Sequence, residues 1–286
     1  DVVTIVKMNK IVIVFLGVGA VMLGSCGGNK TLDTAAPADS VAVAADTVVT
    51  DTLEQLVSET PMPKAADELF DDFFFNFAAN RKLQRKRIAF PLPVTKGNRT
   101  DSITRDKWKT ETFFMRQGYY TLIFNNRKQM DRVKDTTINH VVVKKVFLQS
   151  NGIKEYVFDR RNGLWMMTAI SNTSIAKNNN ASFLNFYKHF ASDPEFQVES
   201  IDETVMFTGP DPDDDFSTME GILTPDTWPA FAPELPHEMI YNIQYGEDYP
   251  ASNFKIFLLR GISNGMETEL TFQHKNGGWK VTSLIQ

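Results

Sequence analysis

Two stretches of the chain, residues 70–77 and 183–190, place aromatic residues at positions i, i+3, i+4 and i+7. This spacing brings the four side chains to one face of an α-helix. An apolar face of this kind is normally buried against another part of the protein. The pattern therefore predicts two amphipathic helices, with Phe73 and its counterpart Phe186 buried at equivalent positions. The aromatic residues are Phe70, Phe73, Phe74 and Phe77 in the first stretch and Phe183, Phe186, Tyr187 and Phe190 in the second.

Apolar, β-branched runs separated by Asn-Gly dipeptides follow each predicted helix. After the first helix, residues 141–149, 156–159 and 164–170 have this character. Asn-Gly between apolar runs favours a tight hairpin, because both central residues of a type I′ turn need a positive φ. Each half of the chain is therefore expected to pack an N-terminal helical section on a curved antiparallel sheet, an α+β architecture. The Asn-Gly pairs are Asn151-Gly152, Asn162-Gly163, Asn264-Gly265 and Asn276-Gly277.

The similarity between the two halves continues beyond the helices in three further blocks, which makes four matched blocks in the same order. Such ordered similarity indicates an internal repeat. We predict two copies of one domain, at residues 63–172 and 178–286, each of ordinary domain size. The blocks after the helices match Ile103–Trp108 with Leu223–Trp228, Lys145–Leu148 with Lys255–Leu258, and Phe158–Trp165 with Phe272–Trp279.

The segment from Met8 to Cys26 has the three regions of an export signal. Lys10 gives a short basic start, an apolar run covers residues 11–22, and Leu23-Gly24-Ser25-Cys26 ends the segment. The apolar run is shorter than the ~20 residues of a membrane-spanning helix. An uncleaved membrane anchor or an ordinary secretory signal are the alternatives. Residues 1–7 precede this segment and are interpreted as an upstream extension.

The ending of this segment resembles the lipobox of bacterial lipoproteins, in which the cysteine is lipidated after cleavage and becomes the new N-terminus. Cys26 is the chain's one cysteine, so it has no partner for an internal disulfide. Residues 1–26 are thus predicted to be a signal peptide with Cys26 as the lipid attachment site. Gly27 at the next position favours an outer-membrane destination, by the same resemblance.

Residues 27–62 are rich in Ala, Thr, Asp, Val, Ser and Pro and contain no aromatic residue. This composition buries too little apolar surface to offset the entropy of ordering. We predict a flexible stalk between the lipid and the repeats.

Taken together, the aromatic helices and the closing Asn-Gly-x-Trp hairpins resemble the nuclear-transport-factor-2-like (NTF2-like, or cystatin-like) superfamily. The resemblance implies two tandem domains, each with a long helix across a strongly bent sheet. With the lipobox and stalk, the chain also resembles an uncharacterised lipoprotein family of Bacteroidetes gut bacteria, a domain of unknown function. That family implies a fold and a cell-envelope location but no activity.

The sequence contains none of the common catalytic motifs. It lacks a Gly-rich phosphate loop, a Gly-x-Ser-x-Gly elbow and a His-Glu-x-x-His motif. Enzymes of the superfamily place an Asp/His or Tyr/Asp group inside the cone of the sheet, but no such pair is evident here. We therefore assign no catalytic residue and no cofactor. The histidines, His140, His189, His237 and His274, occur in unrelated contexts.

The run of carboxylates Asp211, Asp213, Asp214 and Asp215 is the sharpest local feature. Oxygen ligands of this kind suit a hard cation such as Ca²⁺, so Asp211, Asp213 and Asp215 are weak metal candidates. The spacing departs from a calcium loop, and a solvated acidic loop is the favoured interpretation. The matched tryptophans are similarly interpreted as core anchors rather than a sugar-stacking platform. They are Trp108, Trp165, Trp228 and Trp279.

The formal net charge of −5 hides two oppositely charged halves. Residues 67–171 contain 20 Lys and Arg against 11 Asp and Glu, whereas residues 181–286 contain 5 against 17. Opposite charges favour docking of the basic copy on the acidic copy. The rival is a basic copy that faces anionic lipid head groups. Export and a negative total charge argue against nucleic-acid binding.

These observations lead to one expected function with two alternatives. We expect an exported, lipid-anchored cell-envelope protein that acts as a binding or assembly module for a small molecule, a glycan or a protein. An enzyme with its site in one cone is the first alternative. A structural envelope scaffold is the second.

Overall fold

The computed structural model describes residues 62–211, 213–262 and 264–286, which belong to one compact unit. The predicted signal, Cys26 and most of the predicted stalk lie outside the described residues. Within the described part of the chain, every helix is too short or too polar to cross a membrane.

The first repeat has the predicted order of helices followed by strands. Its aromatic helix begins at Phe70, where the predicted apolar face begins. The elements are η1 (Lys64–Asp67), α2 (Phe70–Ala79), α3 (Arg81–Lys86), β1 (Leu92–Lys96), β2 (Arg99–Ile103), η2 (Phe113–Arg116), β3 (Tyr119–Phe124), η3 (Arg127–Lys134), β4 (His140–Phe147), β5 (Gly152–Arg161) and β6 (Leu164–Ser174).

The second repeat follows the same order after η4 (Ile175–Lys177). Its short helix η5 follows the hairpin formed by β7 and β8. The elements are α4 (Ala181–Phe190), α5 (Pro194–Glu199), β7 (Ile201–Asp211), β8 (Asp214–Leu223), η5 (Trp228–Ala230), β9 (Met239–Tyr245), β10 (Phe254–Gly261), β11 (Glu267–Lys275) and β12 (Gly278–Ile285).

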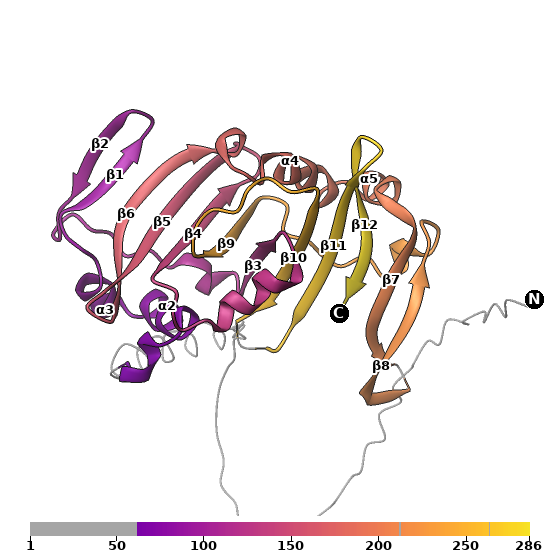
Figure 1. Cartoon of the computed structure of the whole chain (residues 1–286), viewed down its shortest axis with the longest axis horizontal. Helices are drawn as coiled ribbons and strands as arrows, with labels where there is room; N and C mark the ends of the chain where they lie inside the picture. Colours follow the sequence, from indigo (N-terminus) through magenta and orange to yellow (C-terminus); the bar gives the residue numbers. More distant parts are fainter. Residues whose placement is uncertain (1–61, 212, 263) are drawn as a thin grey trace, which may run out of the picture. The chain divides into compact units, whose positions relative to one another are not determined.

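All twelve strands form one sheet in the order β2-β1-β6-β5-β4-β9-β3-β10-β11-β12-β7-β8 (Figure 1). At the centre of the sheet, the two repeats exchange strands. Strand β9 of the second repeat pairs with β4 of the first, and β3 of the first repeat pairs with β10 of the second. Each repeat thus gives one strand to the sheet of the other.

This topology differs from the expectation that each copy completes its own antiparallel meander. The sheet is mixed, because β1 runs parallel to β6, β7 to β12, and β3 to β9. The exchange has a physical reason in burial. Strands β3 and β9 are buried along almost their whole length, and this suits a central position with both faces covered. The predicted division at residues 63–172 and 178–286 remains a prediction.

Two hydrophobic cores lie on opposite faces of the central strands. The first core contains the aromatic face of α2, and the second contains that of α4. On β3, Leu122 belongs to the first core and its neighbour Ile123 to the second. Because successive side chains of a strand point to opposite faces, α2 and α4 cover opposite sides of the sheet.

The helix predictions are confirmed except at one residue. Phe73 is completely buried in the first core, as expected. Phe186 is only partly buried and packs against the edge of the second core. The reason is that α4 places Leu184 in the core, and the ring of Phe196 from α5 covers Phe186 at 5.7 Å.

The predicted type I′ turns are confirmed at two of the four Asn-Gly pairs. At Asn151-Gly152 only Asn151 has a positive φ, and at Asn264-Gly265 only Gly265 does. Both residues of Asn162-Gly163 and of Asn276-Gly277 have positive φ angles, as a type I′ turn requires. After each turn, the strand carries a buried tryptophan, Trp165 or Trp279. All four tryptophans are buried, which supports their interpretation as core anchors.

The strand register corrects one of the matched blocks. Phe158 of β5 lies opposite Val141, whereas its counterpart Phe272 of β11 lies opposite Lys255. Val141 and Lys255 are therefore equivalent, and the match of Lys145–Leu148 with Lys255–Leu258 is shifted by four residues. Similarity of short apolar runs misled the alignment there.

Candidate ligand cavity in the second core

The same tryptophan–glutamine hydrogen bond occurs in both repeats and identifies Trp108 and Trp228 as equivalent positions. The indole of Trp108 donates to the amide oxygen of Gln84 at 3.4 Å, and that of Trp228 donates to Gln197 at 3.2 Å. Counted from these tryptophans, Glu111 corresponds to Phe231. The segments that follow can therefore be compared residue by residue.

In the first core this segment folds into η2 and fills the space beneath the sheet. The ring of Phe113 lies 4.9 Å from those of Phe74 and Tyr156. Phe114 stacks on Tyr120 at 5.1 Å. These aromatic contacts leave the end of the first core closed.

A charged cluster covers the same end of the first core. The hydroxyl of Tyr156 donates to the Glu111 carboxylate at 2.6 Å, and burial raises the pKa of Tyr156 above its usual range. Lys145 and Lys154 form a cross-strand pair, and their ammonium groups lie 3.8 and 3.7 Å from Glu111. Burial lowers the pKa of Lys154.

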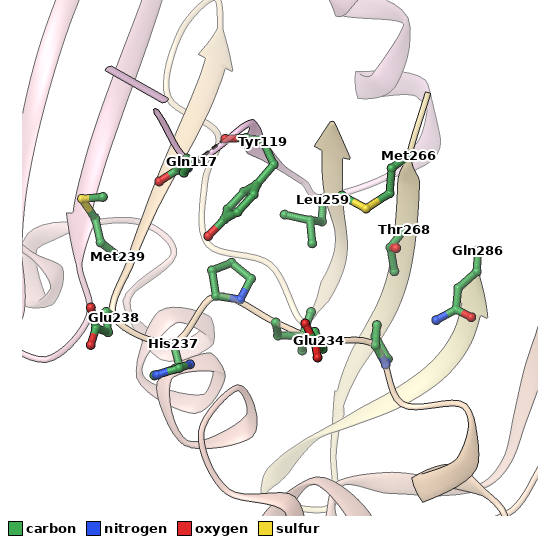
Figure 2. Close-up of a pocket in the computed structure, with 13 residues that line it drawn as sticks. Gln117, Tyr119, Glu234, His237, Glu238, Met239, Leu259, Met266, Thr268 and Gln286 are labelled. Atoms are coloured by element: carbon green, nitrogen blue, oxygen red, sulfur yellow. Dashed lines mark hydrogen bonds between the residues drawn. The ribbon is translucent and has the colours of Figure 1, made fainter. Parts of the chain in front are cut away.

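The second core is open at the equivalent end. The segment after Phe231 reads Ala-Pro-Glu-Leu-Pro and forms no helix before β9. On β10 and β11, the pair Leu259–Thr268 replaces the two lysines. A cavity of about 720 Å³ results (Figure 2). Its lining comprises Gln117, Tyr119, Pro233, Glu234, Leu235, Pro236, His237, Glu238, Met239, Leu259, Met266, Thr268 and Gln286.

Both repeats contribute to this cavity because of the strand exchange. Tyr119 begins β3, and its ring extends into the cavity between Met239 and Leu259 (Figure 2). Partial burial raises the pKa of the Tyr119 phenol, so this group stays protonated at neutral pH. No described residue hydrogen-bonds to its hydroxyl or to that of Thr268.

The wall of the cavity formed by residues 233–239 is held by other elements. The hydroxyl of Tyr187 on α4 donates to the Pro236 carbonyl at 3.0 Å. The Gln149 amide donates to the His237 carbonyl at 3.1 Å, and the Leu148 N–H donates to the Glu238 carbonyl at 2.9 Å. These bonds preform the wall without using its side chains.

A smaller cavity of about 270 Å³ lies beside α2. Asp71 lines it, and burial raises the pKa of this carboxyl. Its two oxygens accept hydrogen bonds from the hydroxyls of Tyr245 and Tyr120. Burial and the charge of Asp71 raise the pKa of Tyr120 to about 12. Asp71 is thus held by two tyrosines that lie far away in the sequence.

The structure describes the side chains of two of the three predicted metal candidates, Asp211 and Asp213. The Asp211 carboxylate accepts the Asp213 N–H at 2.9 Å and the Ser217 hydroxyl at 3.3 Å, so it stabilises the hairpin turn. Asp213 is exposed, and the side chain of Asp215 is outside the described structure. Among the described residues, no group of three or more His, Cys, Asp and Glu is arranged to hold a metal ion. Metal binding here stays a prediction.

The histidines are dispersed, as the sequence indicates. His237 lines the cavity, whereas His140 lies on β4 with its Nδ1 atom 2.8 Å from Asp159. His189 and His274 contact the rings of Phe196 and Trp279.

Sequence reasoning missed both cavities. The signal for the larger one is the difference between Thr-Phe-Phe-Met at 112–115 and Ala-Pro-Glu-Leu at 232–235. This difference becomes visible only when Trp108 and Trp228 are used as the alignment anchor. Nothing local indicates that Asp71 meets Tyr245, because the two are separated by most of both repeats.

Comparison with known proteins supports the fold. The model of a family described as Domain of unknown function (DUF4348) matches residues 49–286. The crystal structure of an NTF2-like protein from Bacteroides fragilis has a TM-score of 0.72 and 42% sequence identity. The match covers 79% of this chain and 98% of that chain. No curated protein matches the sequence. The α+β fold is NTF2-like, as predicted.

Proposed function

We propose, from the premise that this chain belongs to the family of the domain of unknown function DUF4348, that it is an exported binding protein anchored by a lipid on Cys26. Its ligand occupies the cavity of the second core. The single observation behind this proposal is the contrast between the two core ends. One is filled by Phe113, and the other is a preformed cavity with hydroxyls to which no described residue hydrogen-bonds. Preformed, mostly apolar concavities with a few polar groups are characteristic of ligand sites.

The finer architecture belongs to the same proposal. We infer two NTF2-like units that interlock through β3 and β9. The repeated order of elements and the repeated Gln–Trp hydrogen bond support this view. Docking of the basic repeat on the acidic one is also a proposal. Two ion pairs between repeats support it, Arg127–Glu269 at 2.6 Å and Lys144–Asp248 at 3.1 Å.

The ligand proposal is tested by native mass spectrometry of the full chain extracted from bacterial envelopes in mild detergent. Thr268→Phe places a ring in the cavity, and Thr218→Phe on the exposed edge strand β8 is the matched control. We expect a co-purifying mass or a fragment-binding signal with the native chain and the control, and its loss in Thr268→Phe. Binding that survives in Thr268→Phe would contradict the proposed site.

The anchor is tested by Cys26→Ala. Stable membrane attachment generally needs more than one acyl chain, and these are supplied by modification at this cysteine in the proposal. We expect Cys26→Ala to leave the detergent phase or to retain an uncut signal. Unchanged detergent partitioning together with a normally cut chain would contradict lipid anchoring.

A further inference from the structure

The charged side chains of the cavity all have one sign. Glu234 and Glu238 line it, and none of the described lining residues is a lysine or an arginine. Neither glutamate forms an ion pair with a described basic side chain. The rim therefore has two uncompensated carboxylates next to an apolar floor.

The floor and the rim differ in chemistry. Leu235, Leu259 and Thr268 are buried, whereas Glu234 and His237 are exposed. An apolar body of a ligand is stabilised on the floor by removal of its surface from water. A positive group is stabilised at the rim by the two carboxylates, and the Tyr119 hydroxyl is available to hydrogen-bond to the ligand.

A neighbouring depression extends this negative surface. It shares Met266, Thr268 and Gln286 with the cavity and adds Glu267 and Glu269. These two glutamates are paired with Arg260 and Arg127, so they add little net charge. The uncompensated charge is thus concentrated at Glu234 and Glu238.

We propose that the cavity of the second core selects small amphipathic cations, namely molecules with an apolar body and a protonated amine. The inference rests on the proposed function of the cavity as a ligand site. The contrast with the first core supports it, because the equivalent strand positions there hold Lys145 and Lys154, which would repel a cation.

Three fluorinated probes with one apolar body test the inference: 4-fluorophenethylamine, 2-(4-fluorophenyl)ethanol and 3-(4-fluorophenyl)propionate. Their ¹⁹F line broadening is measured with the full chain in mild detergent. Exposed ion pairs contribute up to ~1 kcal/mol each, so we expect the amine to bind a few-fold to about tenfold more tightly than the carboxylate. High salt should reduce this preference, because it screens exposed charges.

Two double variants isolate the role of the rim. Glu234→Gln/Glu238→Gln should remove the preference for the amine and leave binding of the alcohol unchanged. Glu195→Gln/Glu203→Gln changes the net charge equally at exposed positions outside the cavity and should keep the preference.

The possible results separate the inference from the proposal beneath it. Equal binding of the three probes, or a preference for the carboxylate, overturns the cation inference. If Thr268→Phe still abolishes that binding, the cavity remains a ligand site. If no probe binds, or if Thr268→Phe leaves binding unchanged, both the inference and the proposed site are contradicted.

Discussion

At the end of the first core, Phe113 and Phe114 lie under the sheet, whereas Pro233 and Glu234 occupy the equivalent positions in the second. Both segments start three residues after a tryptophan that is held by the same glutamine contact. Two aromatic rings occupy this end of the first core, whereas the second core has a cavity of about 720 Å³ there. The comparison shows that the first repeat uses its core end for packing, while the second leaves it open.

The two cores also differ in their buried polar groups. Asp71 follows Phe70 on α2 and is held by Tyr245, whereas Leu184 follows Phe183 on α4 and packs in the second core. A buried carboxyl is costly unless its hydrogen bonds are satisfied. The first core therefore combines dense packing with a polar network, and the second combines apolar walls with open volume.

The largest expected effect is a loss of stability on truncating one ring in each of the helices α2 and α4. Phe73→Ala should lower the free energy of unfolding by about 3–5 kcal/mol, because a fully buried ring leaves a cavity. Phe186→Ala should cost less, about 1–3 kcal/mol, because the ring is already partly exposed. Denaturant unfolding of both variants measures the difference. Equal losses would show that the two helices are equally well packed.

Removal of the ring that closes the first core should make it resemble the second. We expect Phe113→Ala to cost about 3–4 kcal/mol and to create an apolar cavity that binds xenon or benzene. Chemical denaturation and xenon-dependent NMR shifts provide the measurements. Phe113→Leu, which keeps most of the volume, is the control and should bind neither gas nor benzene. A variant that collapses around the missing ring would break the comparison.

The two repeated glutamines should contribute unequally. Gln84 is fully buried, donates to the Glu111 carbonyl at 2.7 Å and accepts from Trp108. Gln197 is partly exposed and accepts from Trp228. Gln84→Leu should cost about 2–3 kcal/mol and Gln197→Leu about 1 kcal/mol, because unsatisfied buried partners carry the larger penalty. Thermal unfolding at fixed pH compares the pair, and a larger loss for Gln197→Leu would reverse our assignment.

The smallest effect concerns pH. Burial raises the pKa of Asp71 above 3.8, so the folded protein binds this proton more tightly than the unfolded chain. Stability from this group is present below pH ~4 and is lost as the pH rises through the folded pKa. Asp71→Asn should remove this loss, which is on the order of 1 kcal/mol for each pH unit in that window. The stability difference between native and variant proteins, followed from pH 4 to pH 7, measures it.

The control for this experiment is Asp72→Asn, which changes the neighbouring carboxyl on the same helix. It should leave the slope of stability against pH as it is in the native protein. If the slope disappeared in Asp72→Asn but persisted in Asp71→Asn, the titrating carboxyl would be Asp72 and our assignment to Asp71 would be wrong.

The sequence predicts those features that depend on neighbouring residues. The i, i+3, i+4, i+7 spacing identified α2 and α4, and the Asn-Gly pairs identified the hairpins at Asn162 and Asn276. The matched blocks predicted the repeat, and the resemblance of the helices and hairpins to the NTF2-like superfamily predicted the fold. The burial of Phe186 was overestimated, because helical spacing identifies the apolar face but not how deeply each ring lies in the core.

The exchange of β3 and β9 lies beyond local signals, because each pairing partner is more than ninety residues away. Most residues of Tyr119–Phe124 and Met239–Tyr245 are apolar or aromatic, which indicates strands with both faces covered. It does not indicate which repeat covers them. The cavity was missed for a related reason, since its walls come from both repeats and from the loop after Trp228.

The exchange of strands also means that some paired strands are synthesised long before their partners. When the ribosome has finished β4, the strand that will protect its outer edge, β9, is still unsynthesised. Meanwhile β3 has been made, but its partner β10 appears only near the end of the chain. Non-local pairings of this kind slow folding and leave unpaired strand edges exposed. A chain truncated after residue 172 is therefore expected to expose the unpaired edge of β4 and to aggregate rather than fold as an independent half.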